Sequence, residues 1–494
     1  MLSTRFCWRN ASRSIHKHAN NHTVAVGRQH NAFNAIISTP DAEQPTTSGA
    51  LVGKAIAIKD NIVTRDLPTT AASKALSGYE SPIDATVVKL LRQHGATISS
   101  KTNLDEFGMG SHSQNTYAGP VLNPFRRSGQ PLSAGGSSGG SAVAVATGQC
   151  WAALGTDTGG SVRLPAEYTG IVGFKPSYGL LSRWGVIQYA NSLDTVGVLA
   201  QHVADARQVF GTLDKFDEQD PTSLPVLVRE RIRARSNTGD KKHLRIGLPT
   251  EYNIRELSPI VRSAYTRTLY ALQSAGHILQ PISLPSTRRA LSAYYVLAPA
   301  EASSNLAKYD GIRYGYRTAR PDASPKSNLP LYAKTRCEGF GEEVKRRILL
   351  GAYTLSSEAI DNYFIQAQKV RRLVQQDFDQ AFAQPNPLLD LNTSTAARAD
   401  GVDIILAPTA PTLPPTIEEV KRQSTVKSYM NDVFTVPASL AGLPAVSVPV
   451  HLDGEEKSGI EEADVQSVGM QIIGQFGDDE GVLEAAELLE GLYG

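Results

Sequence analysis

Short apolar runs alternate with helical stretches along this chain, and this alternation constrains its fold more than any other feature. The first run, AIAI at 55–58, is unbroken, as in strands that are buried on both faces. Residues 84–94 carry apolar side chains at helical spacing, and Gly95 ends that stretch. Strands are expected at 55–58, 96–98, 150–154, 244–247, 402–406, 445–450 and 470–473, and helices at 84–94, 141–147, 257–278 and 340–382. The alternation predicts an α/β fold with a layered α/β/α architecture, in which a helical region over about 285–380 packs on one side.

The composition argues against several classes of protein. With 494 residues, the chain is long enough for one large domain with insertions or for two to three ordinary domains. A net charge of +1 and the lack of a long basic block argue against a dedicated nucleic-acid groove. Cys7, Cys150 and Cys337 form no CxxC pair, so neither a disulfide framework nor a metal site is expected. No apolar run reaches the roughly 18 residues of a transmembrane helix, so no membrane span is expected.

The N-terminus has a composition of its own. Residues 1–40 contain no acidic residue. Basic residues recur there every four positions, at Arg5, Arg9, Arg13 and Lys17, and would line one face of a helix. This pattern is typical of a mitochondrial presequence, so we predict one in residues 1–30 and a location in the mitochondrial matrix. The alternative is a disordered basic tail.

Two clusters of glycine and serine follow the first strands: AGGSSGGSAVAVA (134–146) and GTDTGGSVRLP (155–165). A phosphate-binding loop is a weak interpretation of the first, because no lysine follows its glycines. The same letters fit Gly-x-Ser-x-Gly, centred on Ser137 or Ser138, which is the nucleophile turn of α/β hydrolases. That alternative requires a histidine base, and the best-placed candidate is His451 at the end of an expected strand.

A serine hydroxyl becomes a good nucleophile when a base removes its proton, and a neutral lysine can be that base. The pKa of lysine is ordinarily about 10.4 and must fall to about 7 for this role, which burial at the end of an apolar strand can cause. Lys59 directly follows the run AIAI and is therefore a candidate. The alternative is a solvated lysine at a strand end.

Several motifs occur together and in order, with Ser161 placed 24 residues after Ser137. They are GKAIAIKDNI (53–62), KTNLDEFGMG (101–110), GGSSGGSAVAVA (135–146), GTDTGGSVRLPA (155–166), GIVGFKPSYG (170–179) and DTVG (194–197). In these motifs the chain resembles the amidase signature family, which implies one large α/β/α domain with a mixed central sheet. By this resemblance, Ser161 is the nucleophile that forms an acyl intermediate, Ser137 is a relay serine preceded by a cis peptide, and Lys59 is the base.

The loop before Ser161 is expected to hold the oxyanion. The backbone N–H groups of Thr158, Gly159, Gly160 and Ser161 would point at the substrate oxygen, because glycine leaves no Cβ in the way. Asp157 and Arg163 flank this loop. We assign them structural roles in fixing it, because a lysine–serine–serine relay has no step for a carboxylate.

Three further stretches narrow the resemblance. They are SSNLAKYDGIRYGYR (303–317), EGFGEEVKRRILLGAYTLS (338–356) and YMNDVFTVPASLAGLPAVSVP (429–449). These stretches resemble the A subunits of glutamyl-tRNA(Gln) amidotransferases, which release ammonia from glutamine. By this resemblance, Arg347 binds the α-carboxylate of glutamine and Asp432 binds its α-ammonium.

Helix geometry supports Arg347 over Arg346 independently. At 100° per residue, Val344, Ile348 and Leu355 mark the apolar face of the expected helix. Arg347 lies close to that face, whereas Arg346 points away. We therefore expect Arg347 to be buried.

The resemblance also implies partners. Ammonia would pass to a B subunit, which would handle ATP, magnesium and Glu-tRNA(Gln), so no cofactor is expected on this chain itself. The region before Asn31 lacks the leading helix and the acidic residues of bacterial members. This difference leaves open whether the usual small third subunit is a partner. The amidase domain is expected over 31–494, with 385–401 as a surface insertion. The alternatives are a free-standing amidase with the same relay and a catalytically silent scaffold.

Overall fold

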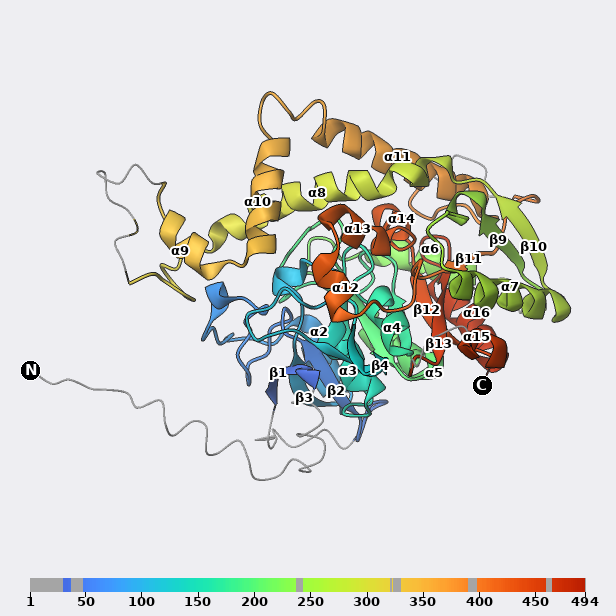
Figure 1. Cartoon of the computed structure of the whole chain (residues 1–494), viewed down its shortest axis with the longest axis horizontal. Helices are drawn as coiled ribbons and strands as arrows, with labels where there is room; N and C mark the ends of the chain where they lie inside the picture. Colours follow the sequence, from blue (N-terminus) through green and yellow to red (C-terminus); the bar gives the residue numbers. More distant parts are fainter. Residues whose placement is uncertain are drawn as a thin grey trace, which may run out of the picture.

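A mixed β-sheet of 11 strands organises the fold (Figure 1). The computed structural model describes residues 30–36, 48–236, 243–319, 322, 330–389, 398–458 and 464–493. In sheet order the strands are β1 (Phe33–Ile36), β3 (Thr97–Thr102), β2 (Ala55–Lys59), β6 (Ala152–Asp157), β8 (Thr195–Ala200), β7 (Val172–Lys175), β12 (Ala445–His451), β13 (Ser467–Ile473), β11 (Ile404–Pro408), β9 (Arg245–Pro249) and β10 (Ile278–Ile282). A separate hairpin pairs β4 (Leu122–Arg127) with β5 (Gln130–Ser133).

The sheet combines parallel and antiparallel pairs. Strands β3, β2 and β6 run parallel to one another, and so do β10, β9 and β11. The strands between these two groups pair antiparallel, as does the edge strand β1 with β3. This arrangement confirms the predicted α/β class and the mixed sheet.

Helices cover both faces of the sheet and extend along one side. They are α2 (Thr86–Gln93), α3 (Gly139–Ala146), α4 (Arg163–Thr169), α5 (Val203–Leu213), α6 (Val226–Ser236), α7 (Pro259–Ser274), α8 (Ala290–Asn305), α9 (Ala333–Gly339), α10 (Glu342–Thr354), α11 (Phe364–Ala381), α12 (Ile417–Arg422), α13 (Thr425–Tyr429), α14 (Val436–Ala441), α15 (Gly454–Ser458) and α16 (Asp479–Gly491). Helix α8 packs against both α10 and α11, and these three lie together at the top of Figure 1.

Side-chain alternation along β2 explains how two helices come to lie on opposite faces. Ile56 and Ile58 belong to the large core cluster that also contains Val87 of α2. Ala57 belongs instead to a second cluster, with Ala142 of α3. Because successive side chains of a strand point to opposite faces, α2 and α3 cover different faces. The small alanine side chains let α3 approach the sheet closely.

The expected elements correspond to observed ones, with two corrections. All seven expected strands overlap observed strands, and the expected helices at 84–94, 141–147 and 257–278 are α2, α3 and α7. The helix expected over 340–382 is instead two helices, α10 and α11. Leu355 lies at the C-cap of α10 with 36% exposure, so it does not belong to the buried face of that helix.

Two expected segments fall wholly or partly outside the described residues. The predicted presequence, 1–30, lies outside them except for its last residue, and residues 390–397 of the insertion expected over 385–401 also lie outside them. Within the described part of the chain, no helix is both long enough and apolar enough to cross a bilayer.

Candidate active site

Lys59 ends β2 with its side chain fully buried. It lies two residues after Ala57, so strand alternation turns it toward α3. Its Nζ donates hydrogen bonds to Ser137 Oγ (2.8 Å), Ser138 Oγ (2.8 Å) and Thr156 Oγ1 (2.9 Å). The solvated strand-end lysine is therefore excluded, and the candidate base contacts the candidate relay serine.

The electrostatic environment of Lys59 suits a base. Burial lowers the pKa of its amine to about 7, although the carboxylates of Asp105, Asp157 and Asp194 act in the opposite direction. An amine with this pKa is substantially neutral near pH 7 and can accept a proton. The apolar run before Lys59 predicted this direction.

The two glycine–serine clusters meet at the N-terminal end of α3. The peptide bond between Gly136 and Ser137 is cis, as the family resemblance implied. Ser138 N donates a hydrogen bond to Ser161 O (3.0 Å) and so joins the two clusters. Gly155 provides room for this approach, because a Cβ there would lie 2.8 Å from Ser138 Oγ. Lys59 thus occupies the place that the α/β-hydrolase alternative assigns to a histidine, while His451 is exposed at the end of β12.

Ser161 lies in the loop that connects β6 to α4, with 8% of its surface exposed. The preceding Gly160 has φ +143°, a backbone conformation that residues with a side chain rarely adopt. A Cβ at this position would lie 2.3 Å from Thr435 Oγ1. The same Thr435 hydroxyl donates to Gly159 O (2.6 Å), which fixes the loop from outside.

The structure corrects the expected set of oxyanion donors. The N–H of Gly160 donates to Asp157 Oδ1 at 2.8 Å, so this donor is already engaged. Among the described residues, the N–H groups of Thr158, Gly159 and Ser161 have no hydrogen-bond acceptor. Gly160 therefore shapes the loop, and the N–H groups of its neighbours can stabilise a developing negative charge.

Asp157 and Arg163 form a buried ion pair at the base of this loop. Arg163 Nε and Nη2 donate to the two oxygens of Asp157, at 3.0 and 2.9 Å. Asp157 also accepts from Val162 N (3.2 Å), and Arg163 Nη1 donates to Gln471 Oε1 (2.6 Å). These contacts agree with the structural role that the sequence suggested for both residues.

Replacing Asp157 by asparagine should therefore destabilise the fold. The substitution leaves the Arg163 charge buried without its counter-ion, for which losses of about 3–5 kcal/mol are typical. Urea unfolding should show this loss of stability, and an activity assay should show a lower rate of amide hydrolysis. Glu167→Gln is a matched control, because Glu167 is a buried carboxyl outside the Arg163 pair and burial raises its pKa well above the usual range, which favours its neutral form. A lower rate for Asp157→Asn with an unchanged free energy of unfolding would contradict the structural role.

Arg347 is buried on α10, as helix geometry predicted, with 3% exposure. Its Nε donates to Glu343 Oε1 (2.8 Å), and its Nη1 donates to Tyr189 OH (2.7 Å). The guanidinium lies 5.5 Å from the ring centre of Tyr295 and 5.9 Å from that of Tyr429. Such a cage of aromatic rings holds a cation in one orientation.

Asp432 is buried in the same region. It accepts hydrogen bonds from Ser111 Oγ (2.7 Å) and Tyr295 OH (3.2 Å), and burial raises its pKa to about 7. Tyr295 therefore contacts both Arg347 and Asp432. The adjacent Tyr294 reaches the loop of Ser161, because a Cβ on Gly159 would lie 2.7 Å from its ring. The structure thus brings both predicted substrate-binding residues to the site.

Aromatic residues that sequence reasoning missed complete the site. Tyr189, Tyr295 and Tyr429 come from a loop, from α8 and from the end of α13, and only the tertiary fold brings them together. Tyr429 belongs to the motif YMNDVF, which is the one local signal for this group. In the part of the chain that the structure describes, no group of His, Cys, Asp and Glu side chains could hold a metal ion.

Comparisons with known proteins agree with this geometry. A protein-family model described as Amidase matches residues 13–483. The A subunit of a mitochondrial glutamyl-tRNA(Gln) amidotransferase from Ajellomyces capsulatus is 58% identical over 478 residues, which cover 92% of each chain. The protein of the same description from Emericella nidulans is 59% identical over 455 residues, covering 89% of each chain.

A solved structure is similar as well. The crystal structure of the A subunit of the Thermotoga maritima glutamyl-tRNA(Gln) amidotransferase superposes with a TM-score of 0.71 and 33% identity, covering 94% of this chain and 88% of that one.

The mitochondrial location predicted for this chain is confirmed by its relatives. From its motifs, its fold and these similarities, the chain belongs to the Amidase family.

Proposed function

We propose that this chain is the glutaminase subunit of a mitochondrial glutamyl-tRNA(Gln) amidotransferase. The observation that carries the proposal is the 2.8 Å contact between the buried Lys59 amine and Ser137, joined through Ser138 to the loop of Ser161. The presence of Arg347 and Asp432 in the same buried site favours an amino-acid amide over a simple amide. The names of the relatives point to the same reaction.

The chemistry begins with neutral Lys59. The amine takes the proton of Ser137 Oγ while Ser137 takes that of Ser161, and Ser161 Oγ attacks the carboxamide carbon of glutamine. The carbonyl oxygen becomes negative and is stabilised by the N–H groups around Thr158 and Gly159. The proton then returns through Ser137 to the nitrogen, the C–N bond breaks, and ammonia leaves a γ-glutamyl ester on Ser161. Water attacks this ester by the same relay and releases glutamate.

Substrate selection rests on two opposite charges. Arg347 pairs with the α-carboxylate of glutamine, and its planar guanidinium favours a bidentate geometry. Asp432 pairs with the α-ammonium, which stabilises its ionised form and so acts against the effect of burial. An amide that lacks the α-carboxylate or the α-ammonium forgoes one of these charge-assisted pairs, which explains selectivity.

The released ammonia serves a partner chain in the mitochondrial matrix. This protein is one subunit of a heteromeric complex, since its relatives are named as A subunits. In the proposed division of labour, a B subunit, with or without a small third subunit, binds ATP, magnesium and Glu-tRNA(Gln). The chain described here supplies the ammonia that converts Glu-tRNA(Gln) to Gln-tRNA(Gln).

Ammonia release from glutamine tests the proposal. The purified chain is assayed alone and with the B subunit, ATP and Glu-tRNA(Gln), with Ser161→Ala as control. We expect strong stimulation by the partner and loss of activity in Ser161→Ala. Hydrolysis of simple amides that is insensitive to the partner would instead indicate a free-standing amidase, and full activity of Ser161→Ala would refute the assigned nucleophile.

A further inference from the structure

Asp194 is a buried carboxylate between the loop of Ser161 and Tyr189, which contacts Arg347, and the mechanism above does not use it. Its Oδ1 accepts a hydrogen bond from Thr158 Oγ1 at 2.7 Å. Its Oδ2 accepts from Tyr189 N (2.8 Å) and from Ala190 N (3.0 Å). One side chain, 3% exposed, therefore holds two different segments of the site.

The two segments have different tasks. Thr158 offers one of the unengaged N–H groups next to Ser161, and its side chain has to be held for that N–H to keep its direction. Tyr189 accepts a hydrogen bond from Arg347 Nη1 through its hydroxyl, at 2.7 Å. Hydrogen bonds through Tyr189, Asp194 and Thr158 thus connect Arg347 to the loop of residues 158–161, which we call the oxyanion loop.

The sheet makes Asp194 a rigid support. Asp194 directly precedes β8, and the antiparallel pairing of β8 with β6 places Thr195 opposite Asp157. The next residue after Asp157 is Thr158, so Asp194 faces it across the ends of two neighbouring strands. A group held in this way keeps its position within a narrow range, as catalytic loops require.

We propose that Asp194 is a positioning residue that aligns the oxyanion loop with the arginine that binds the α-carboxylate. The inference rests on the proposed function, because it needs glutamine as the substrate. Loss of Asp194 then lowers kcat, through Thr158, and raises KM for glutamine, through Tyr189 and Arg347. A residue that only supports the fold would lower the amount of active enzyme and leave KM unchanged.

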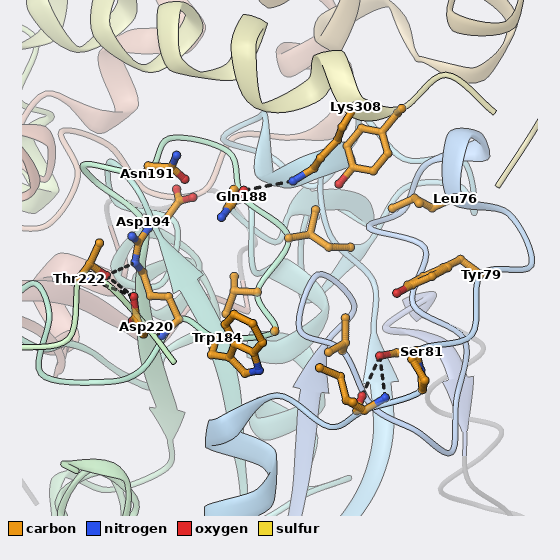
Figure 2. Close-up of a pocket in the computed structure, with 18 of the residues that line it drawn as sticks. Leu76, Tyr79, Ser81, Trp184, Gln188, Asn191, Asp194, Asp220, Thr222 and Lys308 are labelled. Carbon is orange, nitrogen blue, oxygen red and sulfur yellow. Dashed lines mark hydrogen bonds between the residues drawn. The ribbon is translucent and has the colours of Figure 1, made fainter. Parts of the chain in front are cut away.

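Asp194 can also be reached from outside the site. It lines a cavity of about 630 Å³ together with Asn191, Gln188 and Trp184, and Figure 2 shows it beside Asn191 at one side of that cavity. Trp184 is 39% exposed, so the cavity meets the surface of the chain. A small carboxylate such as formate can therefore occupy the space that Asp194→Ala leaves, and can accept the same hydrogen bonds.

The test compares Asp194→Ala and Asp194→Asn in the complete complex, with glutamine and with a simple neutral amide. For Asp194→Ala we expect kcat to fall about 10- to 100-fold and KM for glutamine to rise about tenfold. This fall in kcat is smaller than the roughly 10²- to 10³-fold cost of removing an oxyanion donor, because the N–H of Thr158 is displaced and not lost. With the neutral amide, only kcat should fall. Asp194→Asn keeps one oxygen acceptor, so its kcat and KM should lie between those of the parent and those of Asp194→Ala. This variant carries the test if Asp194→Ala does not fold. Formate should restore a large part of the kcat of Asp194→Ala.

Asp220→Ala is the matched control. Asp220 is also buried and lines the same cavity, but its carboxylate accepts from Arg183 N (2.7 Å) and Thr222 N (2.9 Å), not from the loop of Ser161. Its kinetics should stay close to those of the parent and should not respond to formate.

The outcomes separate the inference from the proposed function. A folded Asp194→Ala complex with parental kcat and KM would overturn the inference, and so would an equal loss on both substrates without rescue by formate. If Asp194→Ala fails to fold, parental kcat and KM in Asp194→Asn would overturn it equally. Retained ammonia release in Ser161→Ala would overturn the proposed function instead.

Discussion

Replacing Lys59 by methionine should lower kcat for glutamine hydrolysis about 10²- to 10⁴-fold, which is the usual contribution of a general base. Methionine keeps most of the length of the buried side chain but cannot accept the proton of Ser137. Lys59→Met and the parent are compared by ammonia release, with thermal unfolding to establish that both are folded. Parental activity of a folded Lys59→Met would contradict the assignment of the base.

The same lysine should set the pH dependence of the reaction. The base must be neutral, and burial lowers its pKa to about 7, so the rate should fall as pH drops below about 7 and level off above it. Lys175→Met is a matched control, because burial also lowers the pKa of Lys175 to about 7, but its amine donates to Pro176 O. The control should keep the parental profile. A parental rate that stays constant down to about pH 5 would be incompatible with a lysine base of this pKa.

Replacing Arg347 by lysine should raise KM for glutamine about 10- to 100-fold. A lysine amine cannot form the bidentate pair with the α-carboxylate, and a hydrogen bond to a charged group contributes about 1.5–3 kcal/mol. Hydrolysis of a simple neutral amide should change little, because that substrate has no carboxylate. Steady-state kinetics with both substrates measure the difference.

Arg346→Lys is the control for this variant. Arg346 neighbours Arg347 and pairs with the same Glu343, but its side chain is 54% exposed, compared with 4% for Arg347. Its substitution should leave KM for glutamine unchanged. An equal loss on glutamine and on the neutral amide in Arg347→Lys would mean that Arg347 supports the fold and does not recognise the substrate.

Sequence patterns predicted the parts of the site that are set by local order. The apolar run before Lys59 placed this residue at the end of a buried strand, and the spacing around Arg347 placed its side chain on the buried face of α10. Both predictions depend on the periodicity of one element, which a sequence displays directly. The family motifs then indicated which serines to place beside Lys59.

Long-range contacts account for what the sequence did not predict. Asp157 engages Gly160 N, and no pattern of letters reveals that one of the loop amides is already bonded. Tyr189 and Tyr295 are more than 100 residues apart in the chain, yet both contact Arg347. The break between α10 and α11 was missed because helical periodicity continues on both sides of the connection at 355–363.

Ser161 should carry the acyl group derived from glutamine, and covalent labelling tests this directly. A glutamine analogue with an electrophilic carbon in place of its carboxamide should react covalently with the nucleophile, and peptide mapping by mass spectrometry identifies the modified residue. We expect modification of Ser161, protection by glutamine, and no modification in Ser161→Ala. Modification of a different residue, with Ser161 untouched, would contradict it.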